Sequence, residues 1–289
     1  MQHAPRAQAR NEIVVETAGQ ICEFLQKPDD AADLAHAALI LATLEHPELD
    51  IARYLSIIDG YADHAAPKLD GLEDPEQLVS ALAAYLAGEC GYRGNTGDYY
   101  DPRNSFLNDV IDRRTGIPIT LSIVYLSLAR RLGLPLFGVG LPGHFIVKFD
   151  DGTNVLYLDP FHAGRLLDRA GCEELARSST GRDFTLSDEH LSATSNHSII
   201  VRMLYNLRGI YSHNLQHRKG LGVADILVRI APANGYEYSN RAGIHLQLGQ
   251  GALARADLET YLALRPDAAD AEDIKKAIAG IRRSQAMMN

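Results

Sequence analysis

One histidine and one aspartate in the middle of the chain have the residue types and spacing of a catalytic pair. His144 stands in the segment GVGLPGHFIVKF, and Asp159 ends the segment VLYLD fifteen residues later. Both segments read as strands, with turn residues at 150–153 between them. A turn there pairs Phe149 with Asn154. The same register sets His144 opposite Asp159, with Cβ atoms about 5 Å apart. We therefore expect a His–Asp hydrogen bond, which would orient the imidazole as a general base.

The element that must position this pair is a well-marked helix. Pro118 suits its first turn, where a missing backbone N–H does no harm, and Gly133 followed by Pro135 suits its end. Apolar residues recur along it at spacings of three, four and seven: Ile117, Leu121, Val124, Tyr125, Leu128 and Leu132. Such a stripe predicts a helix packed into a core. After it the period changes to two, which predicts strands over 136–141, 144–149 and 155–159.

This order of elements resembles the transglutaminase-like superfamily, which shares a papain-type Cys-His-Asp site. The resemblance covers about residues 104–167. Three sequence segments resemble, more narrowly, a bacterial SirB-type group in which tetratricopeptide repeats follow such a domain. They are GIPITLSIVYLSLARRLGLP, GVGLPGHFIVKF and YLDPF. The resemblance implies an α+β fold, with a helical layer and a small antiparallel sheet of transglutaminase-like or papain-like type. It also implies that His144 is the base and that Asp159 orients it.

The nucleophile that the resemblance implies is missing. In active relatives a Cys begins the helix, fifteen residues before the Gly at the helix end, where the helix N-terminus lowers the thiol pKa. Counting back from Gly133 gives Pro118, and the three cysteines lie far from that position in the sequence. A proline has no nucleophilic atom. The substitutes that would have to reach the histidine are Cys90, Thr120 and Ser122.

Residues ahead of the helix could line a binding cleft. The loop GYRGNTGDYYDP, residues 91–102, holds three glycines and three tyrosines, and its candidate binding residues are Tyr99 and Tyr100. An ordinary surface connection is the alternative.

Three further side chains are candidates for the same cleft. In papain-like enzymes a side-chain amide ahead of the nucleophile helps to form the oxyanion hole, so Asn104 or Asn108 could be placed likewise. The alternative for Asn104 is a helix cap. His162 follows Asp159 closely, and we expect it, exposed, at the mouth of the same site.

Composition excludes several classes of protein. With 46% hydrophobic and 22% charged residues among 289, the chain can bury a core. A formal charge of −9 disfavours binding to nucleic acid or to an anionic membrane. Three irregularly spaced cysteines form neither a disulfide framework nor a zinc pattern, so we expect no metal and no cofactor. The N-terminus lacks the apolar core of a signal peptide, and apolar stretches such as 34–44 are too short to span a bilayer, so we expect a cytoplasmic protein.

The remaining chain is helical. Helical spacing at 11–25, 30–45 and 51–65, and a start at Asp74, predict four helices ahead of the site. From about Ile199 the pattern repeats, because Pro232 and Pro266 each follow an apolar helix end and lie thirty-four residues apart. That period indicates tetratricopeptide repeats, closed by a capping helix over 267–288. We expect a transglutaminase-like domain over 1–192 and the repeats over 193–289.

Two functions remain open. The first is a non-catalytic protein, a pseudoenzyme, with a regulatory or protein- or peptide-binding role through its cleft and its repeats. The regulatory role is what the SirB-type resemblance implies. The second is an amide hydrolase or acyl transferase that uses His144 and Asp159 with an unidentified nucleophile or an activated water. The proline at position 118 favours the first function, and the presence of both His and Asp favours the second.

Overall fold

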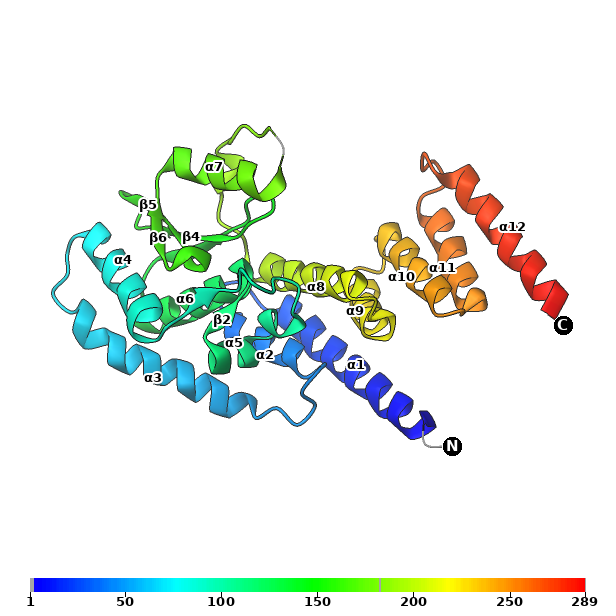
Figure 1. Cartoon of the computed structure of the whole chain (residues 1–289), viewed down its shortest axis with the longest axis horizontal. Coiled ribbons are helices and arrows are strands. Elements are labelled where there is room, and N and C mark those ends of the chain that lie inside the picture. The colour runs from blue at the N-terminus through cyan, green and yellow to red at the C-terminus, as the bar shows by residue number, and fades with distance from the viewer. Residues whose placement is uncertain (1–2, 182, 289) are drawn as a thin grey trace. The chain divides into compact units, whose positions relative to one another are not determined.

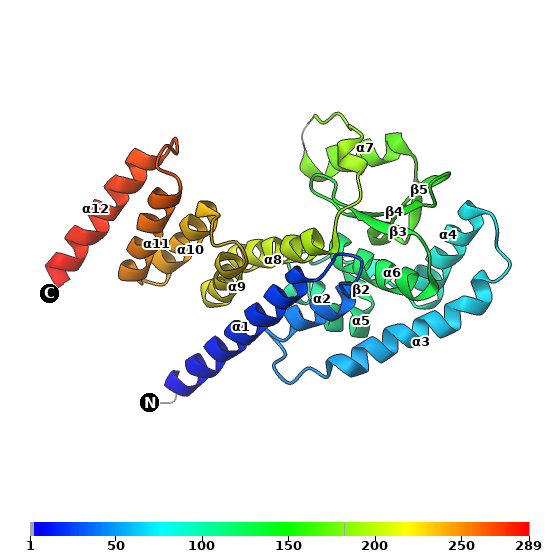
Figure 2. The ribbon, with the colours of Figure 1, turned by 180° about the vertical axis from the view of Figure 1, so that it is seen from behind.

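The computed structural model describes residues 3–181 and 183–288. By their internal contacts they form two compact units. Glu23–Met203 form the first, which we call the sheet unit, and Met1–Cys22 with Leu204–Asn289 form the second, which we call the repeat unit. Figure 1 shows the elements of both units, and Figure 2 shows them from behind.

The sheet unit is built around the helix that the sequence predicted. Helix α6, Pro118–Leu132, has Ile117 as its N-cap, and every residue from Pro118 to Ala129 is buried. Gly133 ends it in the left-handed conformation, with φ +67, a backbone geometry that glycine adopts without strain. Contacts from α6 reach helices α2, α3 and α5 on one side and strands β3 and β4 on the other. The core of this unit therefore lies around α6.

Three other helices of the sheet unit lie at the predicted positions, with shifted ends: α2 (Leu34–Ala42), α3 (Ile51–Leu69) and α4 (Pro75–Ala83). Helix α4 continues into a π-helix over Ala84–Glu89, and the unit also contains α5 (Leu107–Arg113) and α7 (Arg169–Thr180). Asp33, Asp50 and Asp74 cap α2, α3 and α4, each by accepting a hydrogen bond from a backbone N–H of the first turn. Helix α1, His3–Gln26, begins earlier than the sequence indicated and spans the boundary of the two units.

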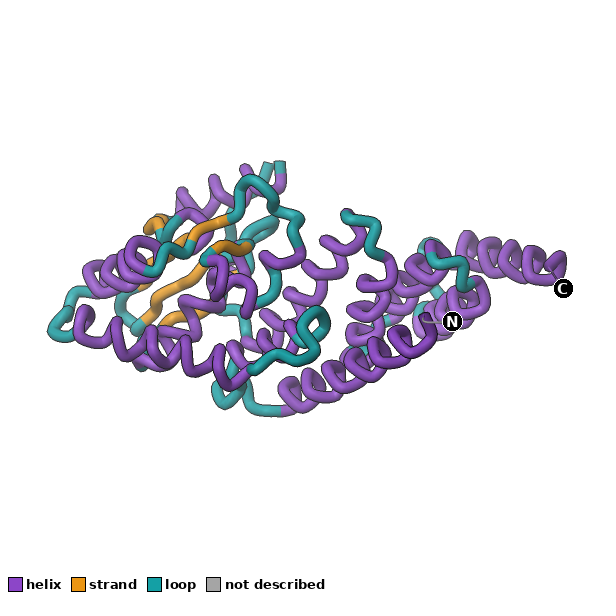
Figure 3. The backbone as a smooth tube through the Cα atoms, turned by 60° about the horizontal axis from the view of Figure 1, so that its bottom comes forward, coloured by secondary structure: helices purple, strands orange, loops and turns teal. Residues whose placement is uncertain are grey.

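A four-stranded antiparallel sheet follows α6 in the chain. Its strands lie in sequence order: β3 (Leu136–Val139), β4 (Ile146–Asp150), β5 (Val155–Asp159) and β6 (Arg165–Leu167). A second, two-stranded parallel pair joins β1 (Arg93–Gly94) to β2 (Thr115–Gly116). Among the described residues, strands occur only in the sheet unit, and Figure 3 shows how short they are beside the helices. The predicted α+β class is confirmed.

The predicted register of the β4–β5 hairpin is wrong by two residues. Phe149 pairs with Leu156, not with Asn154. The connection is residues 151–154, in which the Asp151 side chain accepts hydrogen bonds from the backbone N–H groups of Thr153 (2.8 Å) and Asn154 (2.7 Å). Asp151 thus closes the turn one residue later than the sequence suggested, and His144 falls before the first residue of β4.

The repeat unit contains the helix pairs that the thirty-four-residue period predicted. Its helices are α8 (Asn196–His213), α9 (His217–Ile230), α10 (Gly235–Gln247), α11 (Gly251–Leu264) and α12 (Ala271–Met288). The first eight residues of α8 belong to the sheet unit. Ala242, Ala254 and Leu258 form an apolar cluster with Ile278 of α12. Helix α12 therefore covers the last repeat, as a capping helix must.

The compact units divide the chain within α1 and within α8, whereas the sequence led us to expect domains over 1–192 and 193–289. Compact units are defined by internal contacts, whereas the predicted domains are defined by resemblance to families. The predicted boundary between residues 192 and 193 therefore stays a prediction. None of the described helices is long and apolar enough to span a bilayer.

Because α6 is buried, we expect large-to-small substitutions in this helix to lower the free energy of unfolding. Leu121 is fully buried, so Leu121→Ala should lower the free energy of unfolding of the sheet unit by about 2–5 kcal/mol, through lost apolar contacts and a cavity. Chemical denaturation followed by near-ultraviolet circular dichroism measures this. The control is Val155→Thr at a site that is 47% exposed, which should change the free energy of unfolding by less than about 0.5 kcal/mol. Equal effects from the two variants would contradict the prediction.

Candidate functional site

The His–Asp hydrogen bond that we expected is present, although the register that predicted it is wrong. His144 Nε2 lies 3.0 Å from Asp159 Oδ1. His144 is 6% exposed and Asp159 is fully buried. The imidazole comes from the turn before β4 rather than from a paired strand position. In that turn Gly143 has φ +69, and a Cβ there would lie only 3.0 Å from Ser179. A glycine is thus required beside the histidine.

Asp159 holds more than one partner. Its Oδ1 also accepts the backbone N–H of Phe161 at 3.0 Å, and its Oδ2 lies 2.5 Å from Nδ1 of His162. Burial by itself raises the pKa of this carboxyl, but the hydrogen bonds and charges of His144 and His162 outweigh burial and hold the pKa below its ordinary value. Asp159 is therefore an ionised acceptor. The facing Nε2 of His144 donates, and Nδ1 is the ring nitrogen that remains for chemistry.

Beside this pair lies a cavity of about 500 Å³, which we call the cleft. Its lining consists of Thr96, Tyr99, Tyr100, Pro118, Gly143, His144, Phe161, His162, Leu175, Ser178 and Ser179. Pro118, at the N-terminus of α6, thus shares one cavity with His144. The structure brings the expected nucleophile position and the expected base together, and that position is held by a ring without a nucleophilic atom.

Aromatic side chains form one wall of the cleft. Phe161 contacts the His144 ring edge to face, with centroids 5.8 Å apart, and it contacts Tyr99 in the same way at 6.3 Å. Tyr99 and Tyr100 are 39% and 46% exposed, so a molecule in the cleft can reach both. The tyrosine loop lies where the sequence suggested, and its binding role stays a prediction. Phe161 was not among the candidates, although its place next to Asp159 could have suggested it.

The two asparagines lie outside the described lining of the cleft. Asn104 is fully buried, and its amide donates to the backbone oxygens of Asp98 (2.7 Å) and Tyr99 (3.2 Å). It therefore holds the tyrosine loop. The helix-cap alternative is wrong, because Phe106 occupies the N-cap of α5. Asn108 is 3% exposed, and its side-chain oxygen has no hydrogen-bond partner among the described residues. A role for either amide in binding stays a prediction.

The substitute nucleophiles lie elsewhere too. Thr120 is buried and donates to the backbone oxygens of Asn104 (2.6 Å) and Ile117 (3.1 Å). Ser122 is fully buried. Cys90 lies beside Tyr85, and burial raises the pKa of its thiol, which disfavours the reactive thiolate. None of the three is among the described residues that line the cleft.

One residue that positions the site gave no signal in the sequence. Arg202, on α8 within the sheet unit, donates to the backbone oxygens of Leu141 (2.9 Å) and His144 (2.5 Å). Burial lowers the pKa of its guanidinium, which lies 5.2 Å above the ring of Phe145. A Cβ at Gly140 would lie 2.5 Å from this guanidinium, so Gly140 makes room for it. Arg202 thus fixes the turn that carries His144.

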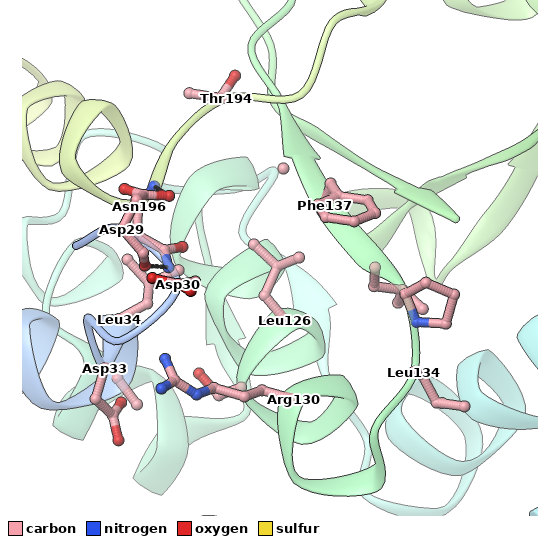
Figure 4. Close-up of a pocket in the computed structure, with 15 residues that line it drawn as sticks. Asp29, Asp30, Asp33, Leu34, Leu126, Arg130, Leu134, Phe137, Thr194 and Asn196 are labelled. Atoms are coloured by element: carbon pink, nitrogen blue, oxygen red, sulfur yellow. Dashed lines mark hydrogen bonds between the residues drawn. The ribbon is translucent and has the colours of Figure 1, made fainter. Parts of the chain in front are cut away.

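A second cavity, of about 560 Å³, lies at the exposed edge of β3 (Figure 4). Asp29, Asp33 and Arg130 lie on one side of it, and Phe137 and Leu134 on the other. The polar groups are already used within the fold. Asp29 accepts from the backbone N–H groups of residues 196 and 197 at 3.0 and 3.1 Å, and Arg130 donates to a backbone oxygen of the segment before α2. These bonds attach the start of α8 to the segment before α2.

The order of elements and the geometry of the cleft define a class of protein. The family model of the transglutaminase-like superfamily matches residues 52–205, and that of the tetratricopeptide repeat matches residues 207–279. The chain belongs to the transglutaminase-like superfamily.

Individual relatives give a more specific comparison than the family models. A UPF0162 protein of Xylella fastidiosa is 35% identical over 241 residues, which are 82% of this chain and 86% of that protein. Protein SirB1 of Salmonella typhimurium is 27% identical over 75% of this chain and 81% of its own length. F-box only protein 21 of Homo sapiens is 30% identical over 53% of this chain, but over only 29% of its own length. The SirB-type resemblance is therefore confirmed. Tetratricopeptide repeats generally mediate contacts between proteins.

The loop that carries the tyrosines of the cleft depends on one carboxylate. Asp101 is 8% exposed and accepts from the backbone N–H and Nε of Arg103, both at 3.0 Å. Arg113 lies 3.2 Å from its other oxygen. Burial raises the pKa of Asp101, but the bonds from Arg103 and the charge of Arg113 outweigh burial and lower it.

This lowered pKa predicts a pH dependence. A carboxyl whose pKa is lower in the folded state stabilises the fold above its unfolded pKa of about 3.9, and the stabilisation is lost as pH falls through the folded value. Asp101→Asn should therefore lower the free energy of unfolding by about 1–2 kcal/mol at pH 7 and by less below pH 4. Denaturation at pH 7 and at pH 3.5 measures this. Asp63→Asn, at an exposed site on α3, is the control. A pH-independent loss in Asp101→Asn would contradict the assignment.

Proposed function

We propose that this protein is a non-catalytic member of the transglutaminase-like superfamily that binds a protein or peptide and acts as a regulator. One observation carries the proposal: Pro118 lines the cleft at the start of α6, beside His144. The proline ring has neither a thiol nor a hydroxyl for the imidazole to deprotonate. The pair of His144 and Asp159 is then retained for shape and for hydrogen bonding.

The lining of the cleft suits a peptide. Among the lining residues, Tyr99, Tyr100 and Phe161 offer flat apolar faces, and the serines at 178 and 179 offer polar groups. The formal charge of −9 disfavours a nucleic acid or an anionic membrane as the partner. The repeats supply a second surface of the kind that contacts proteins. We place this binding in the cytoplasm.

The second candidate is an amide hydrolase or acyl transferase. It is favoured by the intact hydrogen bond between His144 and Asp159, which has the geometry of a base and the residue that orients it. It requires a nucleophile from outside the described lining of the cleft, or a water molecule.

Two measurements separate the candidates. A photo-reactive amino acid in place of Tyr100 should crosslink a protein or peptide from a cell extract, and the same product should form when His144→Ala is added, because binding needs no base. An electrophilic probe for thiols and hydroxyls should label no residue in a His144-dependent way. A single labelled residue that loses its label in His144→Ala would establish the enzyme instead.

The geometry of the cleft predicts that a nucleophile can be restored. In Pro118→Cys the thiol would stand at the N-terminus of α6 beside His144, and both features lower a thiol pKa. Its alkylation by iodoacetamide at pH 7 should be at least about tenfold faster than that of Cys22 in the same chain, measured by peptide mass spectrometry. Adding His144→Ala should remove most of this advantage. A thiol at 118 that reacts no faster than Cys22 would show that the imidazole does not face the position.

A further inference from the structure

Three groups with the chemistry of metal ligands converge beside the cleft. Nε2 of His144, the carboxylate of Asp159 and Nδ1 of His162 each offer one ligand atom, and these atoms all lie within 4.8 Å of one another. Both nitrogens face the same carboxylate, at 3.0 and 2.5 Å from its two oxygens. The two imidazoles are close to parallel, at 19°, with centroids 5.9 Å apart. Two nitrogens and one carboxylate therefore lie close enough together to share one ion, provided that each ligating nitrogen is unprotonated.

The local fold explains why these three side chains meet. Asp159 ends β5 and caps the 3-10 turn Pro160–His162, so the turn carries His162 back over the carboxylate three residues later. His144 arrives from a separate segment, the turn that Arg202 fixes. Asp159 thus lies at a strand end, and the two histidines lie on separate turns that flank it in the sequence.

The ligand types and their charge suit a divalent transition metal. Zn²⁺ binds imidazole nitrogen and carboxylate oxygen at about 2.0–2.2 Å, which sets tetrahedral ligand atoms about 3.3 Å apart. The separation between His144 Nε2 and Asp159 Oδ1, 3.0 Å, is already near that value. The separation between His162 Nδ1 and Asp159 Oδ2, 2.5 Å, is shorter and would have to widen, for which His162, 47% exposed on its turn, has room. Two neutral imidazoles and one carboxylate bring one negative charge. Such a set is typical of open sites, with three protein ligands and a free position.

We propose that His144, Asp159 and His162 form a binding site for a divalent transition metal ion, with Zn²⁺ the first candidate. Asp159 closes the buried side of the site, and the two histidines line the cleft. The remaining coordination position therefore opens toward the cleft, where an oxygen or nitrogen atom of a bound peptide can fill it. The proposal differs from our expectation that the chain holds no metal, and it does not depend on the proposed binding function.

The same three side chains have a metal-free alternative, in which Asp159 simply accepts hydrogen bonds from two imidazoles. In that arrangement the outer imidazole contributes one partly exposed hydrogen bond, and its loss changes nothing that involves metal. In the metal site, the loss of the His162 imidazole removes one of the three protein ligands. The variant that separates the two is therefore His162→Ala, because the exposed position of this residue leaves the core intact.

The experiment is a titration of the untagged, metal-stripped full chain with Zn²⁺ by calorimetry, and with Co²⁺ by visible absorption. We expect one Zn²⁺ per chain and Co²⁺ bands of a tetrahedral or five-coordinate nitrogen and oxygen site. His162→Ala should weaken binding at least about tenfold and remove the bands. The control is His64→Ala, on the exposed face of α3, which should bind as the wild type does.

Three outcomes would overturn the proposal: no saturable binding, binding by His162→Ala equal to that of the wild type, or an equal loss in His64→Ala. Asp159→Gln supplies a second test from the buried side, with circular dichroism to show that the variant is folded. A folded Asp159→Gln protein that keeps full Zn²⁺ affinity would also overturn the proposal. Failure of the metal site would leave the crosslinking result at Tyr100 unaffected, so the two proposals fail separately.

Discussion

The buried carboxylate of Asp159 is the interaction on which the site depends. It is fully buried, yet its pKa lies below the ordinary value, because two imidazoles and a backbone N–H satisfy its oxygens. An ionised carboxylate without such partners would be strongly destabilising in this position. The groups that satisfy it are thereby fixed in place: His144 with Nδ1 left over, His162 at the mouth of the cleft, and the backbone N–H of Phe161. Removing the carboxylate would release all three, so the site is one unit rather than a collection of side chains.

The cleft combines the His–Asp pair of a papain-like site with a proline at the expected nucleophile position. Pro118, in the first turn of α6, lines the same cavity as His144, and Arg202 donates to the backbone oxygen of His144. Pro118 fits this place for a structural reason, because a residue at the start of a helix needs no backbone N–H. The reactive position thus carries no thiol, while the hydrogen bond between His144 and Asp159 is intact. The proposed metal site would use these same groups and needs no thiol.

In the repeat unit, an arginine replaces a small residue of the tetratricopeptide pattern and is accommodated by an ion pair. The first repeat has Arg208 where the second has the small Ala242. Arg208 forms an ion pair with Glu237 of α10, which is 3% exposed, and Tyr205 bonds the same carboxylate at 3.2 Å. Arg241 is held in a similar way by Asp257 and Asp225. Paired charges thus join neighbouring helices of the repeat unit.

The sequence by itself determined the elements with strong local signals. Pro118 and Gly133 bounded α6, alternation marked β5 correctly at both ends, and the thirty-four-residue period gave the helix pairs. Only the tertiary structure decided the register of the β4–β5 hairpin, because Asp151 bonds the turn from within and shifts it by a residue that no periodicity records. It alone assigned Asn104 to the tyrosine loop, and it alone brought Arg202 to the site. The reason is that periodicity and helix caps depend only on residues that are near in sequence. The hydrogen-bond partners of a buried charge can come from segments far apart in the sequence, so only the folded structure identifies them.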